Sequence, residues 1–85
     1  MKLEVYTKTV CPQCTPIKIY MNRNDIKYDM HNIDTDEKAY KKVIDMGMQS
    51  APVLVLSDEN GNVVKTSSGQ AAALDIMNWH KEGLI

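Results

Sequence analysis

Two cysteines, Cys11 and Cys14, are the residues of this sequence whose type and spacing best suit covalent chemistry. They are the only cysteines among 85 residues, and Pro12 and Gln13 separate them. A thiol pair at this spacing can form a disulfide and be reduced again through a mixed-disulfide intermediate. The CxxC segment therefore predicts dithiol redox chemistry.

Two structural uses of the same pair are less favoured. A disulfide across so short a loop removes only about 2 kcal/mol of unfolded-chain entropy, less than a bridge that closes a longer loop. A structural zinc site needs four Cys or His ligands, and only His31 and His80 remain, far apart in the sequence. Redox chemistry is therefore favoured over a staple, a metal half-site or inert thiols.

The position of the pair at the start of a helical pattern assigns different roles to the two thiols. If Pro12 is the first helical residue, Cys11 is the N-cap, and the free backbone N–H groups and the helix dipole favour its thiolate. Cys14 then lies one turn later on the same face. We expect Cys11 to be the nucleophile and Cys14 to be the resolving thiol that attacks the mixed disulfide.

Apolar periodicity predicts four strands and three helices. The expected strands are residues 2–7, 27–33, 52–56 and 63–65, and the expected helices are residues 12–24, a segment from an Asp34 N-cap to a stop at Gly47, and residues 70–81. The order βαβαββα predicts an α/β fold with a central four-stranded mixed sheet and helices on both faces.

Length and charge limit the classes of partner. A chain of 85 residues suits a single domain, residues 1–85, and we expect a monomer. The 10 basic and 11 acidic residues are interleaved, which excludes a nucleic-acid-binding stripe. Because no leader pattern or membrane-length apolar run is visible, we expect a cytoplasmic protein without a membrane partner. In that reducing compartment a CxxC pair is expected to cycle.

Several segments together resemble the thioredoxin superfamily and, within it, the glutaredoxins, most narrowly the NrdH-type redoxins. These segments are residues 5–8 (VYTK), 11–14 (CPQC), 32–34 (NID), Gly47 and 50–53 (SAPV). The resemblance implies a thioredoxin-like fold and a thiol–disulfide oxidoreductase with no tightly bound cofactor. It further implies that electrons pass from thioredoxin reductase, and so from NADPH, to ribonucleotide reductase.

The resemblance also implies a substrate-binding surface around the dithiol. In the superfamily, a cis peptide bond precedes the proline equivalent to Pro52, and the backbone of this loop pairs with the bound substrate chain. The alternative is that Pro52 only begins a buried strand, where proline is tolerated. The residues carried over as substrate-binding are Lys8, Pro12, Gln13, Ala51, Pro52, Ser68 and Gly69.

Departures from both patterns leave the electron source open. Glutaredoxins that use glutathione commonly have Tyr before the second cysteine and an acidic residue at the last helix, whereas this chain has Gln13 and residues 68–72 (SGQAA). NrdH-type redoxins typically follow Ser-Gly with an aromatic residue and a proline, which are also absent here. The alternatives are a glutathione-dependent glutaredoxin and, from another class, a non-catalytic thioredoxin-fold module or a dimer that bridges an iron–sulfur cluster through Cys11.

The remaining residues are given structural roles. Lys8 is either the basic neighbour of the thiolate or an ordinary surface lysine. Tyr6 is expected to fill a sheet face, and Trp79 and the methionines, including Met77, are expected to belong to the core. His31 and His80 are expected to be solvent-facing rather than catalytic, since thiol–disulfide exchange needs no histidine base.

Overall fold

The computed structural model describes residues 1–48 and 50–85 and confirms the predicted order of elements. The strands and helices are β1 (Lys2–Thr7), α1 (Cys14–Arg23), β2 (Asp29–Asn32), α2 (Glu37–Asp45), β3 (Val53–Ser57), β4 (Val63–Ser68) and α3 (Ala71–Lys81). Within these described residues, no helix is long and apolar enough to cross a membrane.

The four strands form one mixed sheet in the order β2-β1-β3-β4. β1 runs parallel to β2 and antiparallel to β3, and β4 is antiparallel to β3. Val5 lies opposite Met30 on one side and opposite Leu54 on the other. The continuous apolar run of β3 is buried along its whole length, as expected of a strand covered on both faces.

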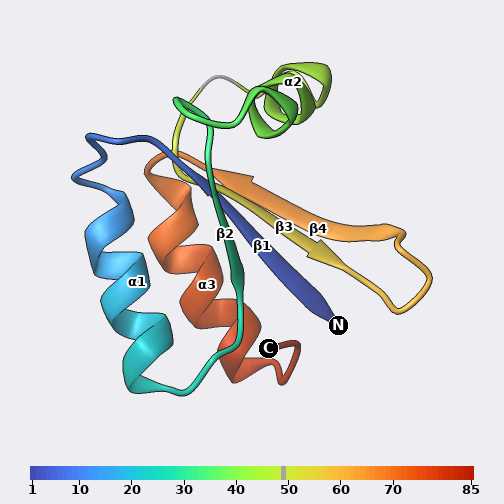
Figure 1. Ribbon diagram of the computed structural model, residues 1–85. Helices are drawn as coiled ribbons and strands as arrows, with labels where there is room; N and C mark the ends of the chain where they lie inside the picture. Colours follow the sequence, from blue (N-terminus) through green and yellow to red (C-terminus); the bar gives the residue numbers. More distant parts are fainter. Residues whose placement is uncertain (49) are drawn as a thin grey trace.

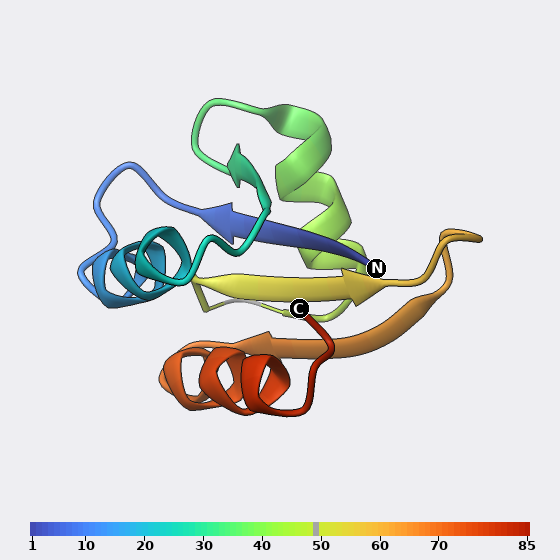
Figure 2. The ribbon, with the colours of Figure 1, turned by 90° about the horizontal axis from the view of Figure 1, so that it is seen from below.

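Helices cover both faces of the sheet, as the sequence predicted. α1 and α3 lie side by side on one face, and α2 lies alone on the other (Figures 1 and 2). Alternate residues of β1 point to the two layers: Leu3 and Val5 pack with α1 and α3, whereas Tyr6 packs with Val43 of α2. The period of two along β1 therefore supplies both cores, and Tyr6 fills a sheet face as expected.

The start of α1 differs from the prediction. The helix begins at Cys14 with Gln13 as its N-cap residue, so the prediction that Cys11 caps a helix starting at Pro12 is wrong. A tight turn comes first, in which the Cys14 N–H donates to the Cys11 carbonyl at 3.1 Å. Such i to i+3 turns often precede the first full helical turn, so Cys11 lies one turn ahead of the helix.

The cap of α2 also differs. Asp36, not Asp34, is the N-cap, and its Oδ1 accepts hydrogen bonds from the Lys38 and Ala39 amides at 3.0 and 3.2 Å. Asp34 lies two residues earlier in a turn and its carboxylate accepts from the Thr9 amide at 2.9 Å. The helix ends as predicted before Gly47, whose φ of 75° suits glycine.

Other boundaries shift by a few residues. β2 is shorter than the expected 27–33, and β4 is longer than the expected 63–65 because it stays paired with β3 as far as Ser68. Trp79 is buried, as predicted, but Met77 and Leu74 are 38% and 62% exposed. The expectation that Met77 belongs to the core is therefore wrong.

Candidate active site

The cysteine pair lies in the connection between β1 and α1, and Cys14 is the first residue of the helix. Figure 1 shows this connection at one end of the sheet. The two sulfurs form a disulfide, and the Cα atoms of Cys11 and Cys14 are 5.3 Å apart. The turn hydrogen bond between the two residues holds their backbones at this short separation. This tight turn thus brings the two thiols within bonding distance.

The two cysteines differ in environment. Cys14 is 3% exposed and faces the layer between the sheet and α1, whereas Cys11 is half-buried and lines an open hollow. The Thr7 hydroxyl donates to Cys14 Sγ at 2.9 Å, and Thr7 is itself buried. One sulfur is therefore accessible from outside, and the other is held by a buried donor.

The hollow beside Cys11 has a volume of about 420 Å³. It is lined by Lys8, Val10, Cys11, Pro12, Gln13, Ser50 and Ala51. Four residues carried over as substrate-binding, namely Lys8, Pro12, Gln13 and Ala51, thus lie around the accessible sulfur. The hollow is formed by two segments far apart in sequence, the loop after β1 and the loop before β3.

The antiparallel register of the sheet explains why these loops meet. Tyr6 lies opposite Val53, so the residues that follow β1 lie beside the residues that precede β3. The peptide bond between Ala51 and Pro52 is cis, as the resemblance implied. The Ala51 side of this loop faces the hollow, while Pro52 is buried behind it.

Ser68 and Gly69 lie behind this loop and, within the described part of the chain, do not line the hollow. The Gly69 N–H donates to the Pro52 carbonyl at 2.9 Å. Gly69 has a φ of 62°, and a Cβ there would meet the Ser50 Cβ at 3.4 Å. The structure therefore places Gly69 as a support for the loop that carries Ala51 and Pro52.

Two features of the site were missed at the level of sequence. The alternation of β1 places Thr7 on the face of Leu3 and Val5, which could have indicated a contact with α1, but its contact with Cys14 was not anticipated. The second feature is the contact from Asp34 to the Thr9 amide, two residues before Cys11. It ties the cysteine loop to the loop between β2 and α2, and no local pattern signals it.

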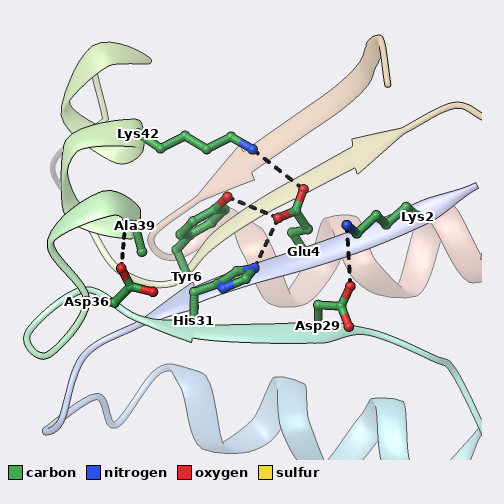
Figure 3. A network of polar contacts seen from close by, with 8 residues as sticks. All are labelled: Lys2, Glu4, Tyr6, Asp29, His31, Asp36, Ala39 and Lys42. Carbon is green, nitrogen blue, oxygen red and sulfur yellow. Dashed lines mark hydrogen bonds and ion pairs between the residues drawn. The ribbon is translucent and has the colours of Figure 1, made fainter. Parts of the chain in front are cut away.

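A polar network occupies the opposite face of the sheet, beneath α2 (Figure 3). The Glu4 carboxylate accepts from the Tyr6 hydroxyl at 3.2 Å, contacts His31 Nε2 at 3.0 Å and pairs with Lys42 Nζ at 3.6 Å. Burial by itself raises the pKa of Glu4, but Lys42 and the two hydrogen bonds outweigh it and lower the pKa below 4.5. Through Lys42 and His31, the network connects α2 and β2 to Glu4 of β1.

The two histidines make contacts on opposite faces of the sheet. The His31 ring stacks on Tyr6 with 5.0 Å between ring centroids, and His80 Nδ1 lies 3.0 Å from the Tyr20 hydroxyl. Both histidines are partly exposed, and each also contacts a tyrosine, which the sequence did not indicate. In the network around Glu4, burial raises the pKa of Tyr6, and the hydrogen bond between Tyr6 and Lys42 raises the pKa of Lys42.

Comparison with known proteins agrees with this geometry. The family model described as Glutaredoxin matches residues 3–60. The chain belongs to the glutaredoxin family. This glutaredoxin is 39% identical over 54 residues to the glutaredoxin-like protein NrdH of Lactococcus lactis subsp. lactis (strain IL1403), a match that covers 64% of this chain and 75% of that protein. The glutaredoxin-like protein NrdH of Lactococcus lactis subsp. cremoris (strain MG1363) is 37% identical over the same lengths.

Solved structures support the fold assignment of this glutaredoxin. The crystal structure of the thioredoxin-like protein BC3987 superposes with a TM-score of 0.68 at 29% identity and covers 89% of this chain and 99% of that chain. A buckwheat glutaredoxin–glutathione complex superposes with a TM-score of 0.60 at 17% identity, covering 96% of this chain and 70% of that chain, which shows the fold alone. The predicted thioredoxin-like fold is confirmed, and the protein is an NrdH-type thiol–disulfide oxidoreductase.

Proposed function

We propose that this glutaredoxin reduces protein disulfides, with Cys11 as nucleophile and Cys14 as resolving thiol. The observation that carries the assignment is the difference in access: Cys11 lines the open hollow and Cys14 is buried against Thr7. An incoming disulfide can reach the Cys11 sulfur, whereas the buried Cys14 can attack only Cys11 Sγ, once Cys11 has formed the mixed disulfide with the substrate.

The reaction balances within the two cysteines and the substrate. The Cys11 thiolate attacks one substrate sulfur, a Cys11–substrate disulfide forms, and the other substrate sulfur leaves as a thiolate that takes up a proton. The Cys14 thiolate then attacks Cys11 Sγ and releases the second substrate thiol, which is also protonated on leaving. Two electrons have passed to the substrate, and the Cys11–Cys14 disulfide must be reduced by a partner.

The proposed client is the disulfide of ribonucleotide reductase, and the proposed reductant is thioredoxin reductase with NADPH. The similarity to proteins named NrdH supports both. The start of the last helix also supports a reductant other than glutathione. Residues 68–72 contain no carboxylate for the glutathione amine, and the first acidic residue of α3, Asp75, already accepts a hydrogen bond from the Ser67 hydroxyl. The same proposal places the cycle in the cytoplasm.

A coupled assay separates the two reductants. NADPH oxidation is followed with a protein disulfide substrate and either thioredoxin reductase or glutathione plus glutathione reductase. We expect turnover with thioredoxin reductase, and turnover only with glutathione would overturn the proposed reductant. Adding oxidised ribonucleotide reductase as the substrate tests the proposed client.

Two variants test the roles of the cysteines. Cys14→Ser should accumulate a covalent complex with the substrate, visible by mass spectrometry and reversed by added thiol, because no internal thiol can resolve it. Cys11→Ser should neither turn over nor form this complex. Catalytic disulfide reduction by Cys11→Ser would contradict the assignment.

A further inference from the structure

A second hollow opens next to the cysteine site, between α2 and the end of β1. Its volume is about 300 Å³, and it is lined by Lys8, Ile33, Tyr40, Val43, Ile44 and Met48. Five of these six side chains are apolar or aromatic. A hollow of this composition suits an apolar side chain rather than a charged one.

The open side of this hollow is formed by residues that the core does not use. Val43 faces the sheet and belongs to the core, but Tyr40 and Ile44 are 53% and 46% exposed and lie one turn apart on α2. A single exposed apolar residue is ordinary, whereas two beside a hollow lined by further apolar residues form a contiguous surface.

The two hollows are neighbours, because Lys8 lines both of them. A polypeptide with its disulfide at Cys11 that extends over Lys8 therefore reaches the hollow between α2 and β1. The aliphatic stem of Lys8 can accompany such a chain while its ammonium group stays in water.

We propose that the hollow beside α2 is a docking site for a large apolar side chain of the protein substrate, close in sequence to its reactive cysteine. This inference rests on the proposed reduction of protein disulfides and specifies the substrate class: disulfides flanked by residues such as Leu, Met or Phe. The occupant is the substrate itself, because this hollow shares Lys8 with the hollow that Cys11 lines, so a chain bonded to Cys11 lies beside it.

The test compares two disulfide-bridged peptides that differ only in one position near the reactive cysteine, Leu in one and Ser in the other. We expect the wild type to favour the Leu peptide by about tenfold in kcat/KM, through KM, because burying one apolar side chain favours binding by about that factor. In Ile44→Ser and Tyr40→Ser the preference should fall to about twofold or less.

Leu74→Ser is the matched control, since Leu74 is 62% exposed on α3, on the other face of the sheet (Figure 2). It should keep the full preference for the Leu peptide. An equal loss in Leu74→Ser, an unchanged preference in both α2 variants, or no preference in the wild type would overturn the proposal.

A binding measurement separates this proposal from the proposed function. A Leu peptide closed by a thioether cannot be reduced, and its binding should shift the amide NMR signals of Tyr40 and Ile44 but not those of Leu74. If the protein reduces neither disulfide peptide and these shifts appear, the docking site stands and the proposed function fails. If both peptides are reduced equally well and the shifts are absent, the docking site fails and the proposed function stands.

Discussion

The buried hydrogen bond from the Thr7 hydroxyl to Cys14 Sγ makes a quantitative prediction about the resolving step. The 2.9 Å contact is the shorter of two that this hydroxyl makes, the other being 3.3 Å to the Lys8 carbonyl, and a hydroxyl has only one proton to donate. In the reduced protein we expect the same donor to stabilise a thiolate at Cys14. Thr7→Val keeps the shape of the side chain and removes the donor.

The expected magnitude follows from the strength of a hydrogen bond to a charged acceptor. Losing about 1.5–3 kcal/mol lowers the fraction of Cys14 thiolate by about one to two orders of magnitude. Because a more basic thiolate is also more nucleophilic, with a Brønsted coefficient of about 0.4–0.5, nearly half of this loss on a logarithmic scale is recovered. Thr7→Val should therefore slow resolution by about four- to fifteenfold near neutral pH.

Rapid-quench experiments measure this step. The reduced protein is mixed with a peptide disulfide, quenched with acid at successive times, and the Cys11–peptide disulfide is counted by mass spectrometry. We expect the intermediate to persist longer in Thr7→Val, and to decay at close to the wild-type rate in Thr7→Ser, which retains the hydroxyl. Resolution by Thr7→Val at the wild-type rate, or equal slowing in Thr7→Ser, would refute the reasoning.

Three further predictions concern positions around the site. Asp34→Ala removes the carboxylate that accepts from the Thr9 amide of the cysteine loop and should lower kcat/KM for peptide reduction by about two- to fivefold. Asp36→Ala removes the α2 cap instead and should lower the free energy of unfolding by about 1 kcal/mol, as measured by urea denaturation. Because the pKa of Glu4 is lowered in the folded state, its contribution to stability is complete above pH 4.5 and is lost as the pH falls through the folded-state pKa. Urea denaturation at successive pH values should therefore show a smaller loss of unfolding free energy with acid in Glu4→Gln than in the wild type. Identical pH dependences would contradict a stabilising role for the Glu4 network. Gly69→Ala and Gly61→Ala both place a side chain at positive φ and should each lower the free energy of unfolding by about 1–2 kcal/mol. Only Gly69→Ala should also slow peptide reduction, because its Cβ meets Ser50 in the loop beside the site, whereas a Cβ at Gly61 meets open space.

Much of the fold could be predicted because its signals are local. The apolar run that forms β3, the alternation of β1 and the stop at Gly47 each depend on a few neighbouring residues. The α2 cap was predicted wrongly because two nearby residues can each cap the helix. Asp34 and Asp36 can both cap α2, and Asp34 is engaged by the Thr9 amide from another part of the chain.

The sequence by itself determined the dithiol, since the CxxC spacing lets one tight turn bring Cys11 and Cys14 together. Only the tertiary structure decided what surrounds each sulfur. The antiparallel register of β1 and β3 places Ala51 beside Cys11, and the packing of α1 on the sheet buries Cys14 against Thr7. These contacts join residues far apart in the chain, so they depend on strand order and layer packing, which no short stretch of sequence specifies.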